Sequence, residues 1–345
     1  MKTDFRTRGA GTRIALAAAA ALAATATLAV SPGRSAAPPK PLRYVALGDS
    51  YSAGSFVRPW ATGDGCGRSA HNYPAQAASR LDVRLTDVTC SAAEVGAGIL
   101  QPQTELTGPP SVPPEGGWRA RPAQIEAVSP AVDLVSVGVG GNSIGFADIV
   151  QKCVEQGLMA FGSGRPCSRH YGEGAGAAAL NARFAALETD FTALLKEIRT
   201  RAPRAKVAVV GYPAIVDDGA GCGWGSWHQF GTVAKGDLPW LDGVERRLNT
   251  LLRDQAQRSG AAYVDTYASS VGHGVCADGE RRWMYGIKDT LTGPGDQGDP
   301  PSQLCRSVPS GGEACTFVHP NLRGVTHQAD VVTAALHGLG APLAH

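Results

Sequence analysis

The sequence predicts an α/β protein with a five-stranded parallel sheet covered by helices on both faces. Short apolar runs of strand length alternate with longer segments of helical periodicity, an order typical of a parallel sheet. No internal repeat and no linker interrupts this alternation. We therefore expect a single domain, over residues 38–345.

The first half of the chain contains three of the predicted strands. Residues 44–47 form an apolar run that ends in a Gly-Asp-Ser turn, and residues 84–89 and 133–139 are further runs of strand length. Helices are expected between these strands, over residues 73–81 and 122–128.

The second half contains the longer helices and loops. Residues 177–200 carry apolar side chains on one helical face, after a Gly-containing segment, 153–176, that we interpret as a loop. A strand, a helix and the last strand follow, over residues 206–211, 241–259 and 261–265. A closing helix over residues 320–337 begins with Pro320, which suits a first turn.

Residues 1–37 have the organisation of an export signal. Basic residues come first, then an apolar run over residues 14–30 and the small residues Ser35-Ala36-Ala37. We predict cleavage near Ala37 and a secreted, extracellular protein. The alternative is retention as a membrane anchor, although the Ala- and Thr-rich run is weakly apolar and barely long enough to span a bilayer.

The composition is that of a globular protein without a nucleic-acid partner. Hydrophobic residues make up 43% and charged residues 18% of the 345, and the formal net charge is +2. The first 37 residues hold five basic side chains and one acidic side chain, so the remainder has no basic excess. No basic patch for a nucleic acid is therefore expected.

The eight cysteines agree with export. An even number in an exported chain suggests four disulfides, although eight cysteines allow many pairings. No two cysteines have C-x-x-C spacing, so we predict no metal site. The simplest arrangement joins neighbours, each pair closing a loop: Cys66–Cys90, Cys153–Cys167, Cys222–Cys276 and Cys305–Cys315.

Four residues follow predicted strands at one edge of the sheet. Ser50, Ala92 and Asn142 come after the first three strands, and His319 lies after the fifth, before the closing helix. With a strand order of 2-1-3-4-5, ligands bind at the switch point between strands one and three, where Ser50 and Asn142 would face each other. A serine there presents its hydroxyl to a crevice and keeps its N–H free, which suits a nucleophile.

These segments resemble the sequence blocks of the GDSL, or SGNH, hydrolases. Gly48-Asp49-Ser50-Tyr51 is similar to the first block, Gly140-Gly141-Asn142 to the third, and His319-Pro320-Asn321 with Gly324 to the last. The resemblance covers most of the chain after the signal and is closest to secreted actinobacterial lipases and esterases. It implies a flavodoxin-like three-layer α/β/α sandwich, ester hydrolysis, and no metal or organic cofactor.

By position, the resemblance implies Ser50 as nucleophile, His319 as general base and then acid, and Asn142 as a side-chain donor to the oxyanion. Two positions depart from the family pattern. Ala92 stands where the second block usually has Gly, and its N–H can still donate if the backbone needs no positive φ. Thr316 stands where an Asp usually orients the histidine, so we expect a Ser–His dyad in which the Thr316 main-chain carbonyl accepts from His319.

Two alternatives remain open. The segment 141–145 matches the G-x-S-x-G elbow of another hydrolase fold and would make Ser143 the nucleophile, with Asp265 and His319 as partners. That fold has a larger sheet, and it leaves the first Gly-Asp-Ser turn without a role. A non-catalytic secreted binding protein on a hydrolase scaffold would explain the two departures from the family pattern, at Ala92 and Thr316. It would not explain why Ser50, Asn142 and His319 are retained.

The predicted substrate is a small-molecule or lipid ester, with acetylated carbohydrate as the alternative. Aromatic residues in and directly after the predicted loop 213–239 either line an acyl site or anchor the loop. They are Trp224, Trp227, Phe230 and Trp240. We expect a monomer that makes transient contact with a lipid surface.

Overall fold

Five strands form a parallel sheet in the order β2-β1-β3-β4-β5, which confirms the order expected from the sequence. They are β1 (Arg43–Gly48), β2 (Arg84–Asp87), β3 (Leu134–Gly138), β4 (Lys206–Val210) and β5 (Ala262–Val264). The computed structural model describes residues 40–61, 63–106, 108, 115–216, 222, 229–287, 306–308, 312–314 and 318–343. Strand β1 pairs with β2 on one side and with β3 on the other, so the segment after β1 lies at the switch point.

The helices connect these strands. The α-helices are α1 (Ser50–Ala53), α2 (Tyr73–Arg80), α3 (Phe146–Met159), α4 (Pro166–Gly172), α5 (Gly174–Arg201), α6 (Leu238–Ser259) and α7 (Leu322–Gly338). Short 3-10 helices are η1 (Gln124–Ala127), η2 (Lys235–Asp237), η3 (Ala268–Ser270) and η4 (Gly279–Arg281). A separate antiparallel pair joins β6 (Arg306–Val308) to β7 (Gly312–Ala314).

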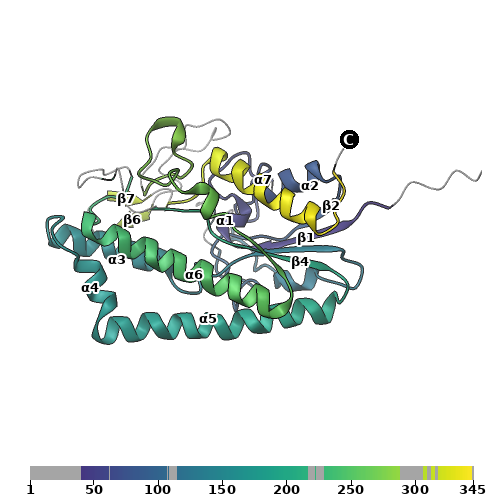
Figure 1. Ribbon diagram of the computed structural model, residues 1–345, viewed down its shortest axis with the longest axis horizontal. Coiled ribbons are helices and arrows are strands. Elements are labelled where there is room, and N and C mark those ends of the chain that lie inside the picture. Colours follow the sequence, from purple (N-terminus) through teal and green to yellow (C-terminus); the bar gives the residue numbers. More distant parts are fainter. Residues whose placement is uncertain are drawn as a thin grey trace, which may run out of the picture. The chain divides into compact units, whose positions relative to one another are not determined.

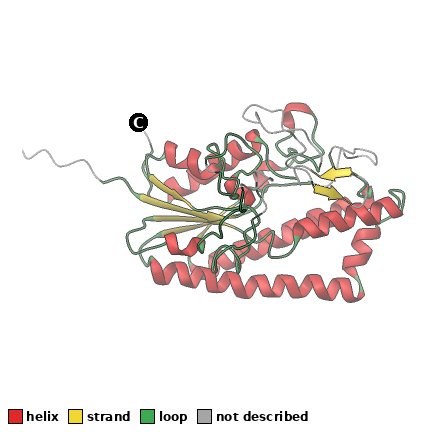
Figure 2. Cartoon of the chain, turned by 180° about the vertical axis from the view of Figure 1, so that it is seen from behind, coloured by secondary structure: helices red, strands yellow, loops and turns green. Residues whose placement is uncertain are grey.

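The sheet is the middle of three layers. Successive side chains of a strand point to opposite faces, and β1 divides accordingly. Val45 and Leu47 belong to the core on the side of α5 and α6, whereas Tyr44 and Ala46 pack with buried residues of α2 and α7. Figures 1 and 2 show α2 and α7 on one side of the strands and α5 and α6 on the other. The predicted three-layer arrangement is thus confirmed.

The largest error of the sequence analysis is the segment 153–176, which is mostly helical, with a short connection over residues 160–165. Helix α3 ends at Met159, and α4 and the start of α5 follow within the same segment. Gly157 is one of the glycines of this segment and is required inside α3, because a Cβ there would lie 2.0 Å from the main-chain oxygen of Thr232. The N-cap, Gly145, also has a left-handed backbone and no capping side chain, so the usual start signal is missing.

The last helix also begins later than predicted. It starts at Leu322, and Pro320 lies before it. Asn321 is the N-cap, and its side chain accepts a hydrogen bond from the Gly324 N–H. Within the described part of the chain, none of the helices combines the length and the apolar character needed to cross a membrane.

Candidate active site

Ser50 lies at the point where β1 turns into the short helix α1. Asp49 is the N-cap of this helix, and its side chain accepts a hydrogen bond from the Tyr51 N–H at 3.0 Å. The Asp49 N–H donates a hydrogen bond to the Gly138 carbonyl of β3 at 3.1 Å, which links this turn to the neighbouring strand. Ser50 is 9% exposed, and its Oγ lies 2.7 Å from His319 Nε2.

His319 reaches Ser50 from a segment that is fixed on several sides. Its carbonyl accepts from the Tyr285 N–H at 2.8 Å, and the carbonyl of the preceding Val318 accepts from the Tyr51 hydroxyl at 2.7 Å. The imidazole lies between two aromatic rings, with centroid distances of 4.8 Å to Tyr51 and 4.6 Å to Phe56. These contacts determine where Nε2 points.

Asn142 follows β3 and lines the same pocket as Ser50 and His319. Its Nδ2 donates to the Ala93 carbonyl at 3.0 Å. An amide nitrogen carries two hydrogens, so this bond orients the side chain and leaves the second hydrogen for another acceptor. The structure therefore brings together the three residues that the sequence places after β1, after β3 and before α7.

Ala92 adopts a backbone conformation that alanine disfavours. Its φ is +62°, so this position does need a positive φ, which Ala92 adopts at a cost while keeping its N–H. A Cβ in the left-handed region costs about 1–2 kcal/mol. The Ala92 N–H and the Ser50 N–H have no hydrogen-bond partner among the described residues. Ala92 does not itself line the pocket, but the next carbonyl, of Ala93, holds Asn142.

The sequence analysis missed a buried hydrogen-bond network, which links the turn after β1 to the segment after β3. Asp49 is 1% exposed and accepts from the Tyr212 hydroxyl as well as from Tyr51, while the Tyr212 hydroxyl accepts from the Gly141 N–H at 2.8 Å. Burial raises the pKa of Asp49 to about 7, and the hydrogen bond from Tyr212 opposes that rise. Tyr212 follows β4 at the same edge as Ser50 and Asn142, so its position was a usable signal.

The pocket in front of Ser50 has mainly apolar walls. Phe146 and Val150 of α3, Leu248 of α6 and Ile215 contribute apolar side chains to the lining, and Glu245 of α6 contributes a carboxyl group. Such a combination of apolar walls and a few polar groups is typical of a site for a small ligand. Among the described residues, no group of three or more His, Cys, Asp or Glu side chains is placed to hold a metal ion.

The residues of the elbow alternative have other partners. The Ser143 hydroxyl accepts from the Val95 N–H at 3.1 Å, and Ser143 does not line the pocket. The Asp265 carboxylate accepts from the N–H groups of Tyr267 and Ala268. The histidine of that alternative triad, His319, instead contacts Ser50.

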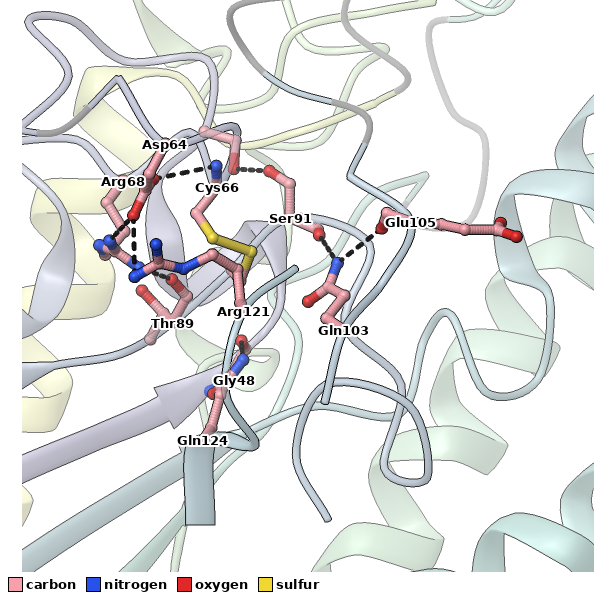
Figure 3. The surroundings of a disulfide bond; sticks show 12 residues. Gly48, Asp64, Cys66, Arg68, Thr89, Ser91, Gln103, Glu105, Arg121 and Gln124 are labelled. Atoms are coloured by element: carbon pink, nitrogen blue, oxygen red, sulfur yellow. Dashed lines mark hydrogen bonds and ion pairs between the residues drawn. A yellow bond between two sulfur atoms is a disulfide. The ribbon is translucent and has the colours of Figure 1, made fainter. Parts of the chain in front are cut away.

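Three of the four predicted disulfides are confirmed: Cys66–Cys90, Cys153–Cys167 and Cys222–Cys276. The Cys153–Cys167 disulfide joins α3 to α4 and closes the connection between these helices, residues 160–165. Figure 3 shows Cys66–Cys90 beside the end of β1, where the Gln124 side chain exchanges two hydrogen bonds with the Gly48 main chain.

Several predicted residues lie outside the described part of the chain: residues 1–37, Trp224, Trp227, Cys305, Cys315 and Thr316. Of the other aromatic residues, Phe230 is buried and Trp240 stacks on Tyr171 with a centroid distance of 5.6 Å. Neither lines the pocket, so these two side chains anchor their segment.

Residues 46–326 match the GDSL-like Lipase/Acylhydrolase family. The chain belongs to this family. The activity of the family makes this GDSL-like hydrolase a carboxylic ester hydrolase.

Relatives of this GDSL-like hydrolase occur in Streptomyces. Lipase 2 of Streptomyces coelicolor is 36% identical over 249 residues, which cover 70% of this chain and 76% of the relative. An esterase of Streptomyces scabiei is 30% identical over 277 residues, covering 73% of this chain and 77% of the relative.

Solved structures share the fold. A phospholipase A1 from Streptomyces albidoflavus has a TM-score of 0.60 at 24% identity, covering 86% of this chain and 99% of that chain. An extracellular lipase from Streptomyces rimosus has the same TM-score and identity and covers 85% of this chain and 99% of that chain.

Proposed function

We propose that this GDSL-like hydrolase is a secreted lipase or esterase that cleaves carboxylic esters through an acyl-Ser50 intermediate. The observation that carries the proposal is the 2.7 Å contact between Ser50 Oγ and His319 Nε2, two residues that line a mainly apolar pocket. A hydroxyl becomes a nucleophile when an adjacent base accepts its proton.

The catalytic cycle uses a Ser–His dyad. His319 Nε2 takes the proton of Ser50 as the Oγ attacks the ester carbonyl carbon. The tetrahedral intermediate collapses when the imidazolium returns this proton to the leaving alkoxide, which departs as the alcohol. His319 then deprotonates a water that attacks the acyl-enzyme, and the acid is released as Ser50 recovers its proton.

Three donors stabilise the oxyanion in this proposal: the N–H groups of Ser50 and Ala92 and the amide of Asn142. The support is that both N–H groups are unused among the described residues and that Asn142 retains one hydrogen after donating to Ala93. Removal of one such donor typically lowers turnover by about 10²–10³.

The group that orients His319 is proposed from the sequence alone. Thr316, which stands where related hydrolases usually have Asp, would accept a hydrogen bond from His319 through its main-chain carbonyl. A neutral carbonyl fixes the orientation of the imidazole, but it stabilises the imidazolium less than a carboxylate does.

The walls of the pocket support an acyl chain as the group bound beside Ser50. Phe146, Val150 and Leu248 offer apolar surface, so lengthening an alkyl chain within reach of these side chains gains about 0.8 kcal/mol per buried CH₂. We propose a lipid or short-chain ester as substrate.

Secretion of a mature domain over residues 38–345 is part of the same proposal. The basic and apolar segments before residue 38, the disulfides, and the likeness to an extracellular lipase of Streptomyces rimosus support it.

Hydrolysis of nitrophenyl esters of increasing chain length tests the proposal. Ser50→Ala and His319→Ala should lose nearly all turnover, at least about 10³-fold. Ser143→Ala, the matched serine control, and Thr316→Ala should retain most of it, because neither removes a reacting group. If Ser143→Ala abolishes turnover while Ser50→Ala does not, the nucleophile is wrongly assigned. If Thr316→Ala is inactive although folded, the carbonyl-oriented dyad is wrong.

A further inference from the structure

We propose that the corner between α3 and α4 docks this enzyme on an anionic phospholipid surface. The corner consists of residues 159–169 together with Lys235, and α4, which begins within this range, lies at the left of Figure 1. The inference concerns a surface outside the pocket, so it does not depend on which residue is the nucleophile.

Two large apolar side chains at this corner face water. Phe161 is 81% exposed and Met159 is 65% exposed, more than any other large hydrophobic residue of the described chain. Met159 is the last residue of α3, and Phe161 is the second residue after the helix. Single exposed apolar residues are common on protein surfaces, so exposure alone does not imply a ligand.

The backbone gives a second, independent observation at Phe161. Helix α3 ends with the Phe161 N–H on the Leu158 carbonyl and the Gly162 N–H on the Gly157 carbonyl, and Phe161 has a φ of +50°. Glycine is the usual residue at this position of a helix end, because a side chain there is strained. Phe161 is therefore strained by its left-handed backbone, and its side chain gains little burial within the chain. A contact outside the chain would account for a phenylalanine at this position.

The charges around these side chains are complementary to an anionic surface. Arg165, Arg169 and Lys235 are exposed, and none of them forms an ion pair with another described residue. Of the nearby acids, Glu155 is paired with Lys152 at 3.0 Å and Asp237 is buried, where it accepts from two main-chain N–H groups; Glu173 is the residue after α4. Apolar side chains beside several cations are typical of proteins that lie on anionic bilayers.

The corner is built to hold these groups in one place. The Cys153–Cys167 disulfide joins α3 to α4, and Asp237 accepts from the N–H groups of Cys167 and Ser168. Gly236, next to Lys235, packs against Arg165, since a Cβ there would lie 2.8 Å from the Arg165 Cγ. A preorganised surface loses less conformational entropy when it binds.

The same helix links the corner to the pocket. Phe146 and Val150, near the start of α3, line the pocket, and Met159 ends the helix. At 1.5 Å per residue, the corner lies about 20 Å along the helix axis from Phe146. Docking through the end of α3 would therefore leave the pocket about 20 Å from the contact, with its polar residues free.

Cosedimentation with vesicles of ether-linked lipids tests the proposal, because these lipids have no carboxylic ester to hydrolyse. Wild-type protein should bind vesicles that contain phosphatidylglycerol more tightly than pure phosphatidylcholine vesicles. Phe161→Gly should weaken that binding about tenfold or more, since burying a phenylalanine side chain contributes about that much. Its melting temperature should be equal to or above that of wild type, and its turnover of a soluble ester should be unchanged. Phe161→Asn, which also tolerates the left-handed region, should behave alike.

A charge variant and an apolar control complete the test. Arg165→Gln combined with Arg169→Gln should weaken binding to the anionic vesicles about 25-fold and reduce its salt dependence. Val271→Ser, which changes another exposed apolar residue at 53% exposure, should bind as wild type does. Wild-type binding by Phe161→Gly would overturn the proposal. So would a dimer in wild type that Phe161→Gly dissociates, because the corner would then contact a second copy of the chain.

Discussion

At the scale of single residues, Asp49 couples the ionisation of the site to its geometry. Its carboxylate accepts hydrogen bonds from Tyr51 beside the nucleophile and from Tyr212, which in turn accepts from Gly141. The same contacts bury it, and burial raises its pKa to about 7. A carboxyl whose pKa is higher in the folded state than in the unfolded state binds its proton more tightly when the protein is folded.

The pH dependence of stability should therefore carry a contribution from Asp49. Between about pH 4, near the ordinary pKa of an aspartate, and pH 7, the folded state retains this proton while the unfolded state has released it. The contribution of Asp49 to the free energy of unfolding is thus greatest below pH 4 and falls as the pH rises to about 7. Asp49→Asn cannot titrate and should lack this fall.

Thermal unfolding of wild type and Asp49→Asn from pH 4 to pH 8 measures the effect. The melting temperature of wild type minus that of the variant should decrease up to about pH 7 and then stay constant. Subtracting the two curves of melting temperature against pH removes the contributions of the other titrating groups, which both proteins share. A difference that increases with pH would mean that the network lowers the pKa of Asp49, contrary to the balance in which burial dominates.

The site residues differ in how far the sequence could predict them. Ser50 and Asn142 directly follow apolar strands, and His319 precedes an amphipathic helix, so the rule that parallel strands end at one edge was enough to bring them together. Tyr212 obeys the same rule, but its role depends on a hydrogen bond to Asp49 that no spacing encodes. The left-handed φ of Ala92 is likewise a property of the folded loop and not of the residue type.

At the scale of elements, α3 shows why a pattern of apolar residues was not enough. Ile149, Val150, Cys153 and Val154 are buried at helical spacing, yet Gly157 and an uncapped start argue for a loop. The missing information is tertiary, because Gly157 is explained only by the approach of the backbone at Thr232 and Ala234. Helix α5, by contrast, was predicted within a few residues because its apolar face runs without interruption.

Gly157→Ala tests this explanation of α3. Its Cβ would lie 2.0 Å from the Thr232 oxygen and 2.8 Å from the Ala234 nitrogen, both main-chain atoms that cannot rotate away. We expect a loss of about 2–4 kcal/mol in the free energy of unfolding, the range of severe overpacking. Because α3 also forms a wall of the pocket, turnover of long-chain esters should fall more than turnover of acetate esters.

The matched control for that variant is Gly243→Ala in α6. A Cβ at Gly243 has no atom within 4 Å, so the substitution should be neutral or stabilising by up to about 1 kcal/mol. Urea denaturation of both variants gives the comparison. Equal stability changes would mean that helix propensity, and not the contact with Thr232, explains the effect at Gly157.

At the scale of the whole molecule, the layers were the most predictable feature. Val45 and Leu47 face one core, and Tyr44 and Ala46 face the other, so β1 is apolar throughout, as expected for a strand covered on both faces. The long connections were the least predictable, because their structure depends on disulfides and on contacts between distant segments. Because the disulfides hold these long connections in place, we expect them to stabilise the whole molecule and not only the loops.

Reduction should therefore destabilise the entire protein. The three described disulfides join residues that are 14, 24 and 54 positions apart. In the chain-entropy description each contributes about 3–4 kcal/mol. Together they contribute about 10 kcal/mol, which is comparable to the whole stability of an ordinary domain.

Thermal unfolding of native protein and of fully reduced, alkylated protein gives the measurement. The reduced chain should be largely unfolded at room temperature or melt tens of degrees lower than the native protein. Among single-pair Cys→Ser variants, loss of Cys222–Cys276 should cost most and loss of Cys153–Cys167 least, in the order of their separations. Non-reducing peptide mapping of the native protein also tests the remaining predicted pair, Cys305–Cys315. If the reduced chain melts as the native protein does, packing of the three layers alone stabilises the fold, and an oxidising compartment is not required for this enzyme.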